Sequence, residues 1–207
     1  MKILSIYPYT HISSAALMIN DRIVAAAPEE RFNRIKMSTA FPFKSIEWCL
    51  KKENLKLKDI DLVTIPWNPA LNINSASSRW VNDLRWRGEM LTNIPVNLMK
   101  ILDTNPSEHI KMNFNDLNVI YLNHHECHAA SAFYTSPFRN CDILTIDGHG
   151  EQDTCFLGVG KNNNVKQIKT IKYPHSVGLF YGTFTDFLGF KADSDEWKVM
   201  ALSSYAK

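Results

Sequence analysis

The order of apolar and polar residues in the first half of the chain predicts short strands that alternate with helices. Asparagine and aspartate favour tight hairpin turns, and Asn20-Asp21-Arg22 separates two of the apolar runs. A Phe-Pro pair at 41–42 suits the start of a helix. The predicted strands are 3–7, 15–19, 23–27 and 62–65, and the predicted helices are 43–52 and a broken stretch at about 75–102.

The pattern of the opening residues returns in the second half of the chain. Strand, polar loop, strand, turn, strand and helix occur near residue 3 and again near residue 143. A duplication of architecture of this kind predicts an α/β protein with two facing lobes and a ligand between them. The predicted strands here are 119–122, 143–146, 154–159 and 165–171, and the predicted helices are 125–134 and 179–188.

Composition narrows the classes of function. A chain of 207 residues with a net charge of +2 gives no support to a nucleic-acid partner. Its four cysteines stand singly, which argues against a zinc ribbon or a disulfide scaffold and favours a reducing compartment. No apolar run approaches the roughly 20 residues that a membrane helix needs. We therefore predict a cytoplasmic protein without a membrane partner.

Three residues form a candidate metal site. His124 and His128 are four residues apart in a predicted helix, so both imidazoles can face one ion. Asp147 ends the apolar run 143–146, where a buried strand delivers a carboxylate beside two glycines. Imidazole plus carboxylate suits iron, zinc or manganese. The alternative is two histidines on a solvated helix face, and His125 should face another direction.

Further candidates lie in predicted loops. His11 follows the first strand, where it is either a general base, a phosphate contact or simply exposed. The charged run 29–36 is usually a solvated surface, although its Arg and Lys residues can also reach a phosphate. Gly148 and Gly150 could let backbone amides approach an anion. The segment 193–198 has the residues of a helix N-terminus.

Seven blocks in one order carry a resemblance to a known family, the O-carbamoyltransferases that modify nodulation factors and antibiotics. The resemblance covers nearly the whole chain except about 68–118. The blocks are Ser13-Ser14-Ala15-Ala16-Leu17, Ala26-Ala27-Pro28-Glu29-Glu30-Arg31-Phe32, Phe41-Pro42, residues 124–133, residues 144–151, Pro174-His175-Ser176-Val177-Gly178-Leu179 and Glu196-Trp197-Lys198-Val199-Met200.

The resemblance implies a two-lobed fold of the actin and sugar-kinase (ASKHA) type, related to the metal-containing module of tRNA threonylcarbamoyl-adenosine synthesis. We place the first lobe at 1–138 and the beginning of a second, partial lobe at 139–207. A further carboxy-terminal domain would convert carbamoyl phosphate and ATP into carbamoyladenylate. Because the chain ends within an apolar segment, we expect it to need that missing carboxy-terminal region or to self-associate.

The resemblance also implies roles for individual residues. A divalent metal, iron before zinc or manganese, would be bound by His124, His128 and Asp147, with another carboxylate from beyond residue 207. His11 would be the general base at the acceptor hydroxyl, and Lys36 would contact carbamoyladenylate. The remaining residues would line the pocket for the nucleotide: Gly148, Gly150, Glu151, Glu196 and Lys198.

We therefore expect an enzyme that transfers a carbamoyl group to a hydroxyl of a small natural product. Two alternatives stay open: a tRNA-modifying or phosphotransfer enzyme on the same scaffold, and a degenerate or truncated nucleotide- and metal-binding module that acts with a partner. Departures from the family pattern keep the second alternative in view, because Ile12 replaces the usual Asp and Ala201 the usual Gly. Residues 203–206 likewise replace Ala-Pro-Tyr-Gly.

Overall fold

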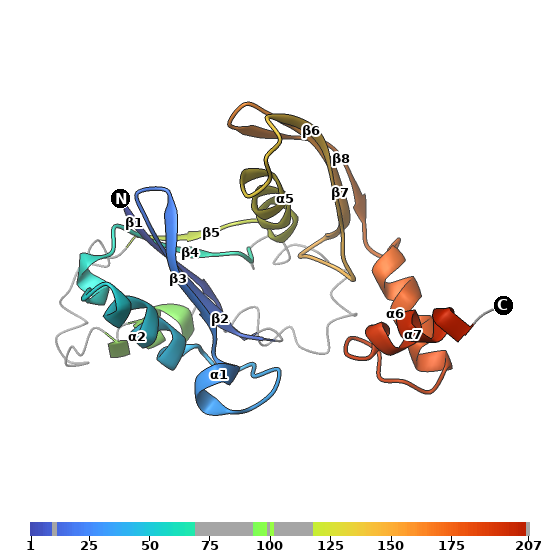
Figure 1. The fold of residues 1–207 in the computed structure, drawn as a ribbon, viewed down its shortest axis with the longest axis horizontal. Helices are drawn as coiled ribbons and strands as arrows, with labels where there is room; N and C mark the ends of the chain where they lie inside the picture. The colour runs from blue at the N-terminus through green and yellow to red at the C-terminus, as the bar shows by residue number, and fades with distance from the viewer. Residues whose placement is uncertain (10–11, 69–92, 99, 102–117, 206–207) are drawn as a thin grey trace. The chain divides into compact units, whose positions relative to one another are not determined.

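The computed structural model describes residues 1–9, 12–68, 93–98, 100–101 and 118–205. Within these ranges the chain forms two compact units, 1–122 and 123–207 (Figure 1). The predicted lobe boundary at 138/139 stays a prediction. Most of the stretch 75–102, where a broken helix was predicted, lies outside the described residues. The parts of it that are described, 93–98 and 100–101, are helical.

The first unit is built on a five-stranded sheet in the order β3-β2-β1-β4-β5. The first three strands are antiparallel, and β4 and β5 run parallel to β1. Asn20 and Asp21 form the β2–β3 turn, both with positive φ, which confirms the predicted hairpin. The strands are β1 (Lys2–Tyr7), β2 (Ser14–Ile19), β3 (Arg22–Pro28), β4 (Leu62–Ile65) and β5 (Val119–Tyr121).

Helix α2 (Phe43–Lys52) has the bounds that the helical spacing predicted, and it covers strands β2 and β3. Its buried residues Ile46 and Leu50 join the core of the sheet, in which Leu4 and Val63 are almost fully shielded from solvent. Short helices α1 (Glu30–Asn33) and η1 (Leu57–Asp59) flank it. The first unit therefore has the α/β construction expected from the sequence.

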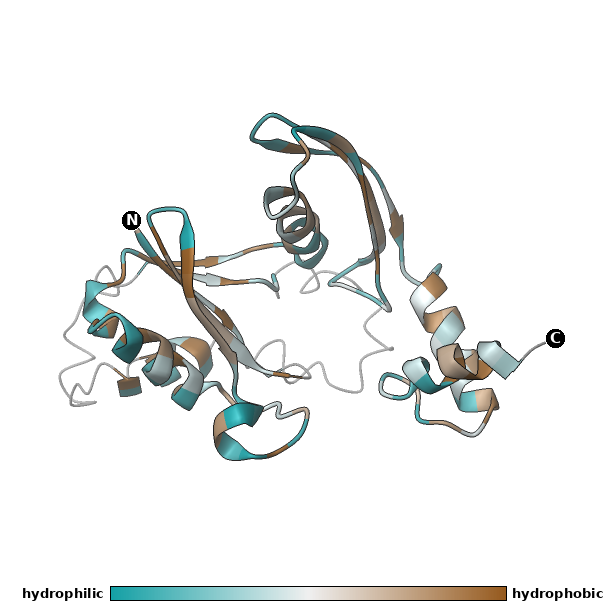
Figure 2. Cartoon of the chain, in the orientation of Figure 1, coloured by the Kyte–Doolittle hydropathy of each residue, from teal (hydrophilic) through white to brown (hydrophobic). Residues whose placement is uncertain are grey.

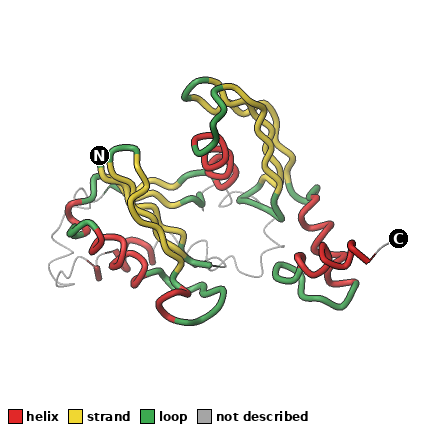
Figure 3. The backbone as a smooth tube through the Cα atoms, in the orientation of Figure 1, coloured by secondary structure: helices red, strands yellow, loops and turns green. Residues whose placement is uncertain are grey.

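The second unit repeats the three-stranded opening (Figure 3). Strands β6 (Asn140–Ile146), β7 (Asp153–Lys161) and β8 (Asn164–Lys172) form an antiparallel sheet in sequence order. The predicted duplication of three antiparallel strands is thus present in both sheets, while two facing lobes stay a prediction. The other elements are α5 (His124–Tyr134), α6 (Val177–Phe187), α7 (Glu196–Leu202) and η5 (Ser203–Tyr205).

Helix α5 packs against one face of the second sheet, where Ala129, Phe133, Ile143 and Phe156 form a small core. Side chains alternate across a strand, so the neighbours of Ile143 point away from this core. Leu144 is 57% exposed, and apolar positions are visible along these strands in Figure 2. The apolar exposure expected for this sheet is present, and self-association stays a prediction.

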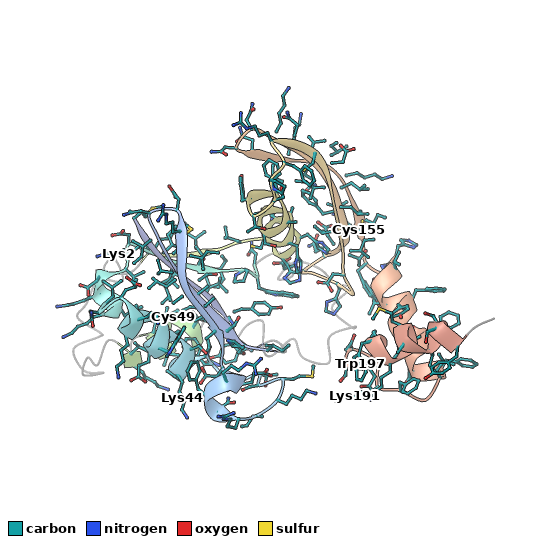
Figure 4. The ribbon with its side chains drawn as sticks, in the orientation of Figure 1. Lys2, Lys44, Cys49, Cys155, Lys191 and Trp197 are labelled. Atoms are coloured by element: carbon teal, nitrogen blue, oxygen red, sulfur yellow. The ribbon has the colours of Figure 1, made fainter. Side chains whose placement is uncertain are left out.

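Among the described residues, no helix combines the length and the apolar character that crossing a membrane requires. All four cysteines are free thiols, as their single spacing predicted. Cys49 lies on α2 and Cys155 on β7 (Figure 4), and burial raises the pKa of both thiols. The protonated thiol is therefore the dominant form at each of these positions at neutral pH.

Candidate metal centre

The first turn of α5 brings two imidazoles together. His124 and His128 lie one helical turn apart, and their Nε2 atoms are 3.0 Å from each other. Their rings meet edge to face, with centroids 4.5 Å apart. Both rings therefore present the same nitrogen to one point in space, as the four-residue spacing predicted.

Asp147 completes a triangle of ligand atoms. It follows the last residue of β6, and its Oδ2 lies 2.9 Å from Nε2 of His124 and 3.3 Å from Nε2 of His128. With metal–ligand bonds of about 2.1 Å, neighbouring corners of an octahedron or tetrahedron lie ~3.0–3.4 Å apart. The separations of 3.0 and 3.3 Å lie within that range, and the separation of 2.9 Å between His124 and Asp147 lies just below it. The side chains of His128 and Asp147 are 48% and 39% exposed, so the triangle is open to solvent on one side.

The environment of Asp147 favours its charged form. Partial burial opposes ionisation, but hydrogen bonds with His124 and His128 and the amide of Gly148 outweigh it and hold the pKa of Asp147 well below its usual range. Burial raises the pKa of the neighbouring Cys127 thiol to about 12, so this thiol is not a ready thiolate ligand. Two nitrogens and one carboxylate oxygen are thus the donor set, and they fit a divalent transition metal.

His125 has a separate, structural position. Its Nε2 lies 3.0 Å from the carbonyl oxygen of Asp153, and its Nδ1 lies 2.6 Å from the hydroxyl of Thr145. A carbonyl can only accept, so Nε2 carries the hydrogen and Nδ1 accepts from Thr145. This neutral ring fastens α5 to β6 and β7. The prediction that His125 faces away from the metal ligands is confirmed.

The stability of the fold should decrease in mild acid because of His125. Burial, and then the nearby charge of His124, lower the pKa of His125 below its ordinary value. The unfolded chain then binds more protons than the folded chain below about pH 6.5, so the free energy of unfolding falls as the pH drops from 7 to 5. Denaturant titrations with a chelator present should show this slope reduced in His125→Gln. Equal slopes in wild type and His125→Gln would contradict this role.

Glu151 anchors the metal-ligand helix to the loop after β6. Its carboxylate is buried, and both oxygens accept from the backbone N–H of His124, at 3.1 and 3.2 Å. A carboxylate at this position satisfies an unpaired amide of the first turn and interacts well with the helix dipole. Sequence reasoning placed Glu151 beside a nucleotide, and that role stays a prediction.

The two glycines of this loop have different surroundings. A Cβ on Gly150 would lie 3.0 Å from the ring of His125 and 3.3 Å from Cβ of His124, so glycine permits the close approach of loop and helix. A Cβ on Gly148 would meet only Leu179, at an ordinary 3.8 Å. The packing of the described residues therefore accounts for glycine at 150 but not at 148.

The loop that carries Lys36 is held at its base by two carboxylates. The buried Glu29 accepts from the backbone N–H and the hydroxyl of Ser45 at the start of α2, and Glu30 accepts from the N–H of Met37. The expectation of a solvated charged surface is therefore wrong for Glu29, because the first turn of α2 needs an acceptor. Lys36 itself is exposed.

His11 lies outside the described residues, and its role stays a prediction. The loop that contains it is fixed at its far end, where the N–H of Ser13 donates to the carbonyl of Ser38 in the Lys36 loop. Ile12 has a φ of 66° and is 42% exposed. The left-handed region disfavours a β-branched side chain and tolerates aspartate, the residue expected there from the family pattern.

Glu196 and Lys198 lie in the first turn of α7, as the N-terminus signal at 193–198 predicted. Glu196 Oε1 accepts from the N–H of Asp193, and the ammonium of Lys198 pairs with Asp195 at 2.9 Å. Their proposed contact with a nucleotide stays a prediction.

A comparison with protein families decides which family carries this site. The family described as carbamoyltransferase N-terminus matches residues 2–207. The chain belongs to this family. The resemblance that the ordered blocks indicated is thereby confirmed. The three candidate metal ligands lie within the matched region.

Relatives of this carbamoyltransferase N-terminus chain share about a third of its residues. The uncharacterized protein sll1178 of Synechocystis is 33% identical over 99% of this chain, and the nodulation protein NolNO of Sinorhizobium fredii is 32% identical over 95% of it. The aligned regions make up 35% and 28% of those two proteins. The chain thus spans about a third of the length of these relatives.

Two solved structures illustrate a remote similarity to the carbamoyltransferase N-terminus chain. YeaZ from Pseudomonas aeruginosa aligns with a TM-score of 0.42 and 12% identity over 84% of this chain and 69% of its own. The Ppx/GppA phosphatase of Aquifex aeolicus aligns with a TM-score of 0.40 and 13% identity over 96% of this chain and 59% of its own. The α/β class rests on the two sheets described above.

Proposed function

We propose that this chain is the metal- and adenylate-binding part of an O-carbamoyltransferase, which transfers a carbamoyl group from carbamoyladenylate to a hydroxyl of a small natural product. The observation that carries the proposal is the convergence of His124, His128 and Asp147 within a carbamoyltransferase family match. Carbamoyl phosphate, ATP and a hydroxylated acceptor would be the substrates, and the cytoplasm the compartment.

The three ligands have properties that suit this role. His124 is held by Glu151 through its backbone, and the charged form of Asp147 is favoured at neutral pH. When bound, a divalent ion would supply positive charge that stabilises charge developing on a phosphate leaving group. The exposed side of the triangle, at His128 and Asp147, leaves room for further ligands. Iron is the first expectation for the metal, with zinc or manganese as alternatives.

Two residues of the first unit would act on the reactants directly. Lys36 is exposed on a loop whose base is fixed, so its ammonium can meet an anionic phosphate without a large rearrangement of the backbone. His11 would remove the proton of the acceptor hydroxyl as the carbamoyl carbon is attacked. The carbonyl–phosphate oxygen bond would then break, and AMP would leave.

Removal of Lys36 tests whether the chain binds the adenylate. A stable analogue in which an N-carbamoylsulfamoyl group replaces the carbamoyl phosphate should bind, as measured by calorimetry on a protein that carries residues 1–207. Lys36→Ala should weaken binding by roughly 1.5–3 kcal/mol, the cost of one charge-assisted contact. Lys44→Ala, which alters another exposed lysine (Figure 4), is the matched control and should have no effect. Equal binding by Lys36→Ala and wild type would remove Lys36 from the proposal.

A pair of glycine variants separates a ligand contact from a packing role. Gly150→Ala should destabilise the fold by about 1–3 kcal/mol, because the added methyl crowds the ring of His125, Cβ of His124 and the carbonyl oxygen of Asp153. Gly148→Ala should leave the melting temperature unchanged and yet weaken binding of the same analogue. If Gly148→Ala binds the analogue normally, the turn at Gly148 does not contact the adenylate.

A further inference from the structure

The hydroxyl of Ser176 touches the turn that presents Asp147. This oxygen lies 2.7 Å from the carbonyl oxygen of Gly148 and 3.1 Å from that of Asp147. A carbonyl only accepts, so the hydroxyl donates its hydrogen here, with Gly148 the closer acceptor. Ser176 is 29 residues from Asp147 in sequence, so this contact depends on how the second unit folds.

The same oxygen also begins helix α6. It accepts a hydrogen bond from the backbone N–H of Leu179 at 3.0 Å, which makes Ser176 the N-cap residue. Gly178 follows in the first turn, and a Cβ there would lie 2.5 Å from the carbonyl oxygen of Asp147. The start of α6 is therefore in direct backbone contact with the turn at Asp147, at a distance that only glycine allows.

Thr154 of β7 forms hydrogen bonds with both segments that meet in this contact. Its carbonyl accepts from the N–H of Asp147 at 3.0 Å, and its hydroxyl lies 2.5 Å from the carbonyl oxygen of His175, the residue before Ser176. Thr154 is buried, so water does not compete for these bonds. Both partners of the Ser176–Asp147 contact are thus fixed to the same residue of β7.

A continuous series of hydrogen bonds then reaches the metal ligands. The carbonyl of Asp147 accepts from Ser176 at 3.1 Å, the N–H of Gly148 in the same peptide group donates to Oδ1 of Asp147 at 2.7 Å, and Oδ2 of Asp147 faces both imidazoles. The peptide group between Asp147 and Gly148 therefore connects Ser176 to the carboxylate. Orientation of this peptide determines where Oδ2 points, because one carboxylate oxygen is bound to it.

We propose that Ser176 is a positioning residue of the metal centre, whose hydroxyl donates to the backbone carbonyls of Asp147 and Gly148 and so holds Asp147 in place before a metal arrives. The inference rests on the metal site of the proposed function and adds a residue to it. Replacement of a residue that orients a metal ligand typically lowers the affinity for the metal by about 10–100-fold. An N-cap alone would affect stability and leave the affinity for metal unchanged.

Three substitutions at this position separate the two roles. Ser176→Thr keeps both the donor and the acceptor. Ser176→Asp keeps an acceptor for the N–H of Leu179 and removes the donor, because an ionised carboxylate only accepts. Ser176→Ala removes both. Thr183→Ala is the matched control, because Thr183 lies on the same helix. Within the described residues its hydroxyl donates to the carbonyl of Leu179, one turn earlier in the helix, and not to the turn at Asp147.

The measurement is the affinity of each chain for Zn²⁺, by competition with a chromophoric chelator, with the unfolding of the metal-free chain measured in parallel. Ser176→Thr and Thr183→Ala should bind Zn²⁺ as wild type does. Ser176→Asp and Ser176→Ala should bind about 10–100-fold more weakly. The visible spectrum of bound Co²⁺ should also change in these two variants, because the carboxylate ligand is displaced.

Wild-type affinity in both Ser176→Asp and Ser176→Ala would overturn the inference and leave the metal site standing. A loss of stability without a change of affinity in these variants would have the same meaning. If the wild-type chain binds no Zn²⁺, the metal site of the proposed function fails, and the role of Ser176 fails with it.

Discussion

Replacement of His11 by alanine should slow carbamoyl transfer by about 10²–10⁴-fold, the usual contribution of a positioned general base. The acceptor hydroxyl is a weak nucleophile until its proton is removed, and an imidazole is the side chain best suited to accept that proton near neutral pH. Binding of the adenylate should change little, because a general base acts mainly in the transition state. The rate constant should therefore fall while the affinity for the adenylate analogue is retained.

This experiment requires residues 1–207 followed by the carboxy-terminal region of the family, with carbamoyl phosphate, ATP and a hydroxylated acceptor. Formation of carbamoyladenylate should continue in His11→Ala, since the family resemblance assigns that step to the other region. Thr10→Ala is a suitable control because it alters the preceding residue and removes no base. Transfer at nearly the wild-type rate from pH 6 to pH 9 would show that the base is another group.

Much of the fold could be predicted because its signals are local. Short apolar runs bounded by polar residues predicted the strands of both sheets, and the Asn20-Asp21 turn has the positive φ angles that these residues tolerate. The metal ligands could also be predicted, because a four-residue spacing fixes the relation of His124 and His128 on any helix. Asp147 followed from its place at the end of an apolar strand.

The residues that support the ligands could not be predicted in the same way. Glu151 accepts from the N–H of His124, 27 residues away, and Ser176 donates to the turn at Asp147, 29 residues away. Such contacts depend on how α5 and α6 pack on the second sheet, and no periodicity reports that packing.

Charged residues showed the limits of sequence reasoning most clearly. The run 29–36 has the composition of a solvated surface, yet Glu29 is 4% exposed and binds the first turn of α2. An unpaired helix N-terminus attracts a carboxylate strongly enough to bury it. The result favours the proposed role of Lys36, because a loop fixed by Glu29 and Glu30 presents an exposed ammonium with little loss of conformational entropy.

Loss of metal from the triangle of ligands is the second large effect that we expect. Removal of two of the three ligand side chains in His124→Ala/His128→Ala leaves a single carboxylate, which cannot hold a transition metal against water or a weak chelator. Affinity should therefore fall by more than about 100-fold, beyond the effect of any residue that only orients a ligand. Carbamoyl transfer in the longer protein should be lost together with the metal.

Elemental analysis combined with Zn²⁺ titration of the chain tests the central claim most directly. Wild-type protein purified without chelator should carry up to one divalent ion per chain, lose it on dialysis against a chelator, and take up one equivalent of Zn²⁺ afterwards. The His124→Ala/His128→Ala variant should carry none and show no tight binding, while a His175→Ala variant, which alters an exposed histidine, should behave as wild type. Retention of the ion by His124→Ala/His128→Ala, with wild-type affinity, would contradict the assignment of the metal centre.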